Sequence, residues 1–129
     1  QAYANASEID STKQHLDVMK AGRVMPNRVS YNTLAQACAK VGNVPEMLGC
    51  LGRMKAARFD PDLVTYTSAM RACSLSKPRQ PQMAEQLLRR LPGAGIQADR
   101  PFMRAAAAAI GGDRLGALRT ELGLEVKRR

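Results

Sequence analysis

Three short polar side chains that form directional hydrogen bonds recur along the chain with a nearly constant period. Asn27 and Asp62 each follow a proline, and Asp99 stands at the corresponding place after Ala98, so the intervals are 62 − 27 = 35 and 99 − 62 = 37 residues. An Asn or Asp in front of a helix can cap it by accepting a hydrogen bond from a free backbone N–H. The same oxygens can accept hydrogen bonds from a ligand. The spacing alone leaves a capping role and a binding role equally open.

A five-residue phrase follows two of these positions and indicates the elements that must carry them. Val29-Ser30-Tyr31-Asn32-Thr33 reappears as Val64-Thr65-Tyr66-Thr67-Ser68. A period of this length is typical of helical-repeat solenoids, in which each unit buries its apolar face only against its neighbours. The sequence therefore predicts an all-α fold, an α-solenoid of about three stacked αα-hairpins in a right-handed superhelix.

The apolar pattern divides each unit into two helices. In the first complete unit, Leu34, Cys38 and Val41 recur at helical spacing before Gly42-Asn43 ends the helix, and a second apolar stripe follows over residues 44–57. We expect residues 1–27 to be the end of a preceding incomplete repeat, 28–62 a repeat, 63–99 a repeat with a two-residue insertion in its turn, and 100–129 a degenerate C-terminal repeat or cap.

Two helix ends carry specific expectations. The stripe over residues 9–19 has the pattern of a second helix, so only part of the first helix of that unit is expected before it. In the 63–99 unit, the second helix is expected to be closed by the segment Pro92-Gly93-Ala94-Gly95. The chain opens on Gln1, in the middle of a repeat, so we expect a fragment or a processed form.

Composition narrows the class of partner. There are 20 basic and 11 acidic residues, a net charge of +9. Such an excess favours a polyanionic partner, either nucleic acid or an anionic membrane surface, although it can also simply solvate the outer helix faces. No apolar run approaches the roughly 20 residues that span a bilayer, so no membrane insertion is expected.

The sequence offers no catalytic or metal-binding motif. Its cysteines are odd in number and form no Cys-x-x-Cys pair, and Cys38 and Cys73 are 73 − 38 = 35 residues apart, as expected for core positions of successive repeats. The sole histidine, His15, is expected at a surface or packing position. Because no phosphate-binding loop and no nucleophile with a nearby base is present, we expect a non-enzymatic protein without metal or cofactor.

The repeat unit 28–62 resembles the pentatricopeptide repeat (PPR) family. The residues that carry the resemblance are Val29, Tyr31-Asn32-Thr33-Leu34, Lys40, Gly42, Met54 and Pro61-Asp62. The second unit matches through Val64, Tyr66-Thr67-Ser68, Ala84, Leu91, Gly95-Ile96 and Asp99, and the opening fragment through Met19, Gly22 and Pro26-Asn27. Tetratricopeptide repeats differ, because they favour a small residue at the place of Met54 and lack the Tyr-Asn-Thr phrase.

The resemblance implies that the chain binds single-stranded RNA, with one base contacted per repeat by two or three side chains. In that family, the residue after the repeat's tyrosine and the last residue of the repeat select the base. The implied selecting pairs here are Asn32 with Asp62, resembling a uracil-preferring pair, and Thr67 with Asp99, resembling a guanine-preferring pair. Asn27 would complete a pair whose other member precedes the chain.

The resemblance also assigns the clamping positions. The positions that sandwich the base correspond to Val29 and Val64, whereas Pro101 and Arg104 replace the clamp and the selector in the last unit. That replacement argues against base selection by the last unit.

Basic side chains are predicted on both helix sets. Lys40 and Arg71 are expected near the face that carries Asn32 and Thr67, where they would contact phosphates. Four further cations are expected on the convex side formed by the second helices, facing solvent or another protein: Arg53, Lys55, Arg89 and Arg90.

Two functions remain open at this point. One is organellar RNA metabolism in a mitochondrion or chloroplast, through stabilisation, processing or translation of transcripts. The other is a scaffold subunit of a larger organellar assembly, such as a ribosome. Two selecting pairs specify only two bases, which recur about once in sixteen positions, so two repeats cannot select a transcript by themselves.

Overall fold

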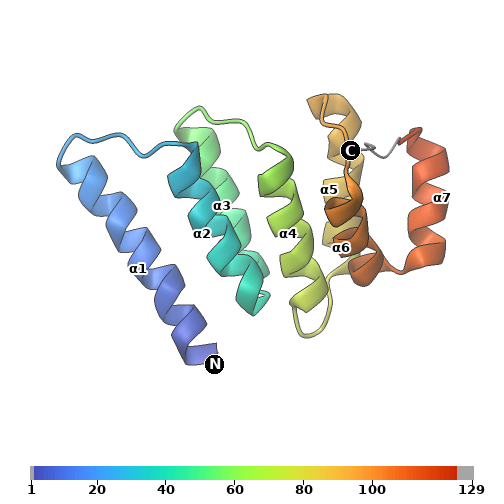
Figure 1. Ribbon diagram of the computed structural model, residues 1–129, viewed down its shortest axis with the longest axis horizontal. Helices are drawn as coiled ribbons and strands as arrows, with labels where there is room; N and C mark the ends of the chain where they lie inside the picture. The colour runs from blue at the N-terminus through green and yellow to red at the C-terminus, as the bar shows by residue number, and fades with distance from the viewer. Residues whose placement is uncertain (1, 125–129) are drawn as a thin grey trace.

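The protein is a row of packed α-helices (Figure 1). The structure, a computed structural model, describes the backbone of residues 2–124 and the side chains of residues 8–124. Within them lie seven helices: α1 (Ala2–Ala21), α2 (Arg28–Val41), α3 (Val44–Ala56), α4 (Leu63–Leu75), α5 (Pro81–Ala94), α6 (Arg100–Ile110) and α7 (Gly112–Leu122). The predicted all-α helical-repeat solenoid is confirmed.

The helices form two layers. α2, α4 and α6 pack side by side as a first-helix layer, and α3 and α5 lie behind it (Figure 1). α1 packs against α2 at one end of the row, and α7 against α6 at the other. Because each hairpin contacts mainly its neighbours in sequence, equivalent residues of successive repeats come to lie in rows across the layer.

The α2–α3 hairpin shows how the sequence sets the turns. Gly42 ends α2 in the left-handed conformation, with φ of 67°, and the side chain of Asn43 caps α3 by accepting from Glu46 N. The Cα of Gly42 also lies against the end of α4, so that a Cβ there would stand 2.5 Å from the carbonyl carbon of Leu75. Glycine is therefore required at this turn by both conformation and space.

The core lies between the layers and is apolar. Cys38 and Cys73 are 0 % and 1 % exposed, and Cys50 is buried as well, with all three thiols free. The prediction that these cysteines are core residues is confirmed. The largest fully buried side chains include Tyr31, Phe102, Leu16, Leu34, Met47, Met54, Met70, Leu87, Leu88, Leu91 and Leu118.

Of the two expectations at helix ends, the one for the first helix is wrong. Residues 2–8 continue α1 without a break, instead of ending a separate first helix, because neither Gly nor Pro interrupts residues 2–21. α5 includes Pro92 and ends at Ala94, with Gly95 as its cap at φ of 70°, so it ends within the predicted closing segment.

No helix in the described part of the chain is long and apolar enough to cross a membrane.

Candidate functional site

Successive first helices display one exposed row of side chains. Val29 on α2 and Val64 on α4, near the helix starts, are 71 % and 48 % exposed, although valine is normally buried. Asn32 and Thr67 follow one turn later and are half-buried. On α6, Pro101 and Arg104 occupy the corresponding positions, and both are exposed.

Asn32 and Asp62 meet through a third residue. The hydroxyl of Thr65 lies 2.6 Å from Asn32 Oδ1 and 2.9 Å from Asp62 Oδ1, and so donates its one proton to either oxygen. The Thr65 backbone N–H donates to Asp62 Oδ1 at 3.0 Å, while Asp62 N donates to Thr65 Oγ1 at 3.3 Å, which forms a capping box at the start of α4. Thr65 is fully buried, which fixes this Asn32–Thr65–Asp62 cluster in place.

Arg28 adds a positive charge to the cluster. Its Nη1 lies 3.8 Å from Asp62 Oδ2, and its guanidinium stands over the Phe59 ring, 5.6 Å from the centroid. Partial burial raises the pKa of Asp62, but the Thr65 hydrogen bonds, the charge of Arg28 and a hydrogen bond from Asn32 outweigh it, so the pKa lies below the ordinary aspartate value. Asp62 is therefore ionised at neutral pH and acts only as an acceptor.

The second pair is built differently. Asp99 caps α6 by accepting from Phe102 N at 2.9 Å, and Thr67 Oγ1 donates to the Leu63 carbonyl of its own helix at 2.7 Å. Phe102 stands where the other pair has Thr65, so no hydroxyl is available there to link the two side chains. Thr67 and Asp99 are half-buried, and each retains oxygen lone pairs for a further hydrogen bond.

Asn27 is an exposed helix cap. Its Oδ1 accepts from Ser30 N at 3.0 Å and from Ser30 Oγ at 3.1 Å at the start of α2. All three recurrent polar residues thus cap a first helix, and for Asp62 the structure combines capping with contact to a second selecting residue.

The predicted phosphate-binding cations are both exposed. Lys40 forms an ion pair with Glu8 of 3.5 Å beside a cavity of about 400 Å³ between α1 and α2. Arg71 lies on α4 one turn beyond Thr67 and forms no ion pair within residues 8–124. Both side chains are therefore available to a ligand on the row, Lys40 by exchanging its carboxylate partner.

The four cations expected on the second helices divide into two groups. Arg53 pairs with Asp17 of α1 at 3.4 Å, and Arg89 pairs with Glu121 of α7 at 2.6 Å. Lys55 and Arg90 form no ion pair with any other described residue and line a cavity between α3 and α5. His15, on α1, is exposed.

Comparison with known protein families decides where the chain belongs. Residues 26–75 match the PPR repeat family, and residues 1–40 match the pentatricopeptide repeat domain family. The chain belongs to the pentatricopeptide repeat family. Among curated proteins, no sequence matches this one.

A solved structure shares the fold of this PPR protein. It is the PPR domain of protein-only RNase P 1 of Arabidopsis thaliana, determined in complex with tRNA. The similarity has a TM-score of 0.69 at 16 % sequence identity, and it covers 98 % of this chain and 68 % of the other.

Two residues of the PPR surface escaped sequence reasoning. Thr65 and Arg28 organise the first selecting pair, yet neither belongs to it. The spacing Asp62-x-x-Thr65 signals a capping box, so the role of Thr65 toward Asp62 was detectable. Its hydrogen bond to Asn32, 33 residues away, arises only when α2 and α4 pack together.

In residues 8–124, no three His, Cys, Asp or Glu side chains gather into an arrangement that could hold a metal ion.

Proposed function

We propose that this PPR protein binds single-stranded RNA along the exposed row of α2, α4 and α6, one base per repeat. The observation that carries the proposal is the Asn32–Thr65–Asp62 cluster, flanked by two exposed valines. An isolated cap needs only the Asp62–Thr65 contact, whereas here the cap also holds a second polar side chain at the surface.

The chemistry of the first pair suits uracil. A carboxamide offers both a donor and an acceptor, as does the Watson–Crick edge of uracil, with its carbonyls and N3–H. Ionised Asp62 contributes acceptors only, and the Thr65 hydrogen bond restrains Asn32. Val29 and Val64 would cover the two faces of the base, because their apolar surface is exposed.

The second pair supports a guanine preference. Thr67 offers a hydroxyl that is both donor and acceptor, and Asp99 offers a carboxylate that accepts from the imino and amino groups of guanine. Arg104, in the selector position of the last unit, would meet a phosphate instead of a base, since guanidinium groups suit phosphate oxygens.

The wider assignment is a non-enzymatic protein of organellar RNA metabolism, in a mitochondrion or chloroplast. Membership of the PPR family and the fold similarity to a PPR domain crystallised with tRNA support RNA binding. The scaffold alternative is favoured by a separate observation: Lys55 and Arg90, which belong to the second helices α3 and α5 and not to the helices of the row, line a cavity of their own.

Binding of a short fluorescent RNA that contains U-G tests the proposal. We expect Asn32→Ala combined with Thr67→Ala to weaken binding at least about tenfold and to abolish discrimination against an A-A sequence. Thr33→Ala combined with Ser74→Ala is the matched control, because both hydroxyls donate only to carbonyls of their own helices. Equal affinities of both double variants would refute base selection by these residues.

A further inference from the structure

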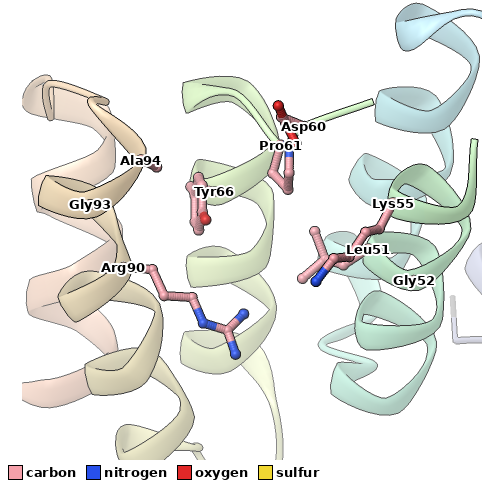
Figure 2. A pocket seen from close by; sticks show the side chains of 9 residues that line it. All are labelled: Leu51, Gly52, Lys55, Asp60, Pro61, Tyr66, Arg90, Gly93 and Ala94. Carbon is pink, nitrogen blue, oxygen red and sulfur yellow. The ribbon is translucent and has the colours of Figure 1, made fainter. Parts of the chain in front are cut away.

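A cavity of about 730 Å³ opens between α3 and α5. Figure 2 views it from the second-helix side, with α4 behind it. Gly52 of α3 and Gly93 of α5 lie at its edges, and a Cβ added to either would meet no atom within 4 Å. The absence of two side chains thus widens the space between the helices.

Two cations enter this cavity from opposite helices. Lys55 extends from α3 and Arg90 from α5 (Figure 2). The ion pairs of the described residues include neither of them, although neighbouring Arg53 and Arg89 are both paired. Like charges facing one cavity repel each other unless an anion lies between them.

In the preceding repeat, the arginine equivalent to Arg90 has a carboxylate partner. Arg53 directly precedes Met54 and Arg90 directly precedes Leu91, so the two arginines are equivalent. Asp17 stands two residues before Met19, as Gly52 stands two before Met54, so the position of Asp17 is taken by Gly52. Arg53 reaches across to the Asp17 carboxylate at 3.4 Å, whereas Arg90 faces a glycine.

A tyrosine hydroxyl opens into the same cavity. Tyr66 of α4 is 6 % exposed, lines the cavity, and its hydroxyl forms no hydrogen bond with the described residues. Although most of this side chain is buried, its hydroxyl is not among the fully buried polar atoms, so it can donate a hydrogen bond to a ligand in the cavity. An ammonium group, a guanidinium group and a hydroxyl thus line one cavity. Asp60 also lies on its wall, but no ion pair joins it to Lys55 or Arg90.

We propose that the cavity binds the carboxylate of an Asp or Glu side chain that a partner protein presents. The bound carboxylate would take the place that Asp17 occupies beside Arg53, between Arg90 and Lys55 and within reach of Tyr66. Leu51 and Ala94 provide an apolar wall for the methylenes of that side chain. With Asp60 also on the wall, the charged groups of the cavity are Lys55, Arg90 and one carboxylate, so their net charge is 2 − 1 = +1. That charge matches one carboxylate better than the several charges of a polyanion such as RNA.

Short synthetic peptides with a Glu between leucines, and the same peptides with Gln, test this site. We expect the Glu peptides to shift the NMR signals of the Arg90 guanidinium and the Tyr66 ring, and the Gln peptides to leave them unchanged. Gly52→Asp places a carboxylate of the chain itself opposite Arg90 without a steric clash, and should weaken Glu-peptide binding at least about tenfold.

Arg90→Gln should weaken peptide binding as Gly52→Asp does, and Arg89→Gln should not, because Arg89 already has carboxylate partners. Thermal melts of each variant show whether the fold is retained. Equal binding of Glu and Gln peptides, or no binding of either, overturns the proposal. So does a loss of single-stranded RNA affinity in Gly52→Asp equal to its loss of peptide affinity, since the cavity would then bind phosphate.

Discussion

Asn32 is held by a residue of the next repeat. The Thr65 hydroxyl that contacts it belongs to α4, while Asn32 itself lies on α2. A selecting side chain restrained in this way loses less rotamer entropy when RNA binds than a free surface asparagine would. The packing of neighbouring repeats therefore contributes to base selection at a single residue.

A single exchange tests base selection at this scale. Asn32→Thr gives the first repeat the residue that the second repeat has in Thr67, with an aspartate completing both pairs. We expect the preference at the first base to move from U toward G by about tenfold, since the hydroxyl lacks the paired donor and acceptor of a carboxamide. Competition between U-G and G-G oligonucleotides measures it, and an unchanged preference contradicts the assignment.

The thiols illustrate a residue property that follows from burial. Burial raises the pKa of Cys38 to about 11 and that of Cys50 to about 12. Desolvation likewise raises the pKa of Cys73 to about 11. Since the thiolate is the reactive form, these cysteines are inert at neutral pH in the folded chain.

At the scale of helices, two glycines end helices in the left-handed conformation but differ in their surroundings. Gly42 and Gly95 both end helices with positive φ, of 67° and 70°, but only at Gly42 would an added Cβ meet another element. Comparing substitutions at these two glycines therefore distinguishes the cost of a left-handed backbone from the cost of close packing.

Alanine substitutions at these two glycines should differ in cost. We expect Gly95→Ala to lower the free energy of unfolding by about 1–2 kcal/mol, the cost of a left-handed alanine. Gly42→Ala should cost about 1–3 kcal/mol more, because its Cβ meets the backbone of Leu75 and pushes α2 away from α4. Urea denaturation measures both, and equal losses would show that the close contact relaxes freely.

The helices could be predicted from the sequence more completely than the contacts between them. Gly42 and Asp62 predicted their helix ends because caps depend on local backbone chemistry. α5 likewise ends within the segment Pro92-Gly93-Ala94-Gly95, at a glycine with positive φ. The Asn32–Thr65 and Arg28–Asp62 contacts were out of reach, because they depend on how two repeats pack.

At the scale of the whole molecule, part of the positive charge is already paired with carboxylates. The net charge is +9, yet Arg53, Arg89 and Arg114 of the second-helix side are engaged by carboxylates. Lys40, on α2, is likewise paired with Glu8, whereas Arg71, Lys55 and Arg90 form no ion pair with the described residues. The structure therefore concentrates usable positive charge on fewer residues than the composition indicates.

The salt dependence of RNA affinity should reflect this distribution. Three phosphate contacts, by Lys40, Arg71 and Arg104, predict a slope of log affinity against log salt near −2.1, at about −0.7 per contact on a single strand. Lys40→Gln and Arg71→Gln should each reduce the slope by about 0.7, and Arg89→Gln should leave it unchanged. Affinities measured over a range of potassium chloride concentrations test this, and a slope unaffected by either substitution excludes these contacts.

Asp62 constrains how such a protein can change during evolution. Because it both caps α4 and meets Asn32, a mutation there alters stability and recognition together. Only residues that cap the N-terminus of a helix well, chiefly Asp, Asn, Ser and Thr, preserve the stability of α4 when they stand at this position. Position 32 lies within a helix and does not cap one. New base specificities should therefore arise first by substitution of Asn32, while few residue types can replace Asp62.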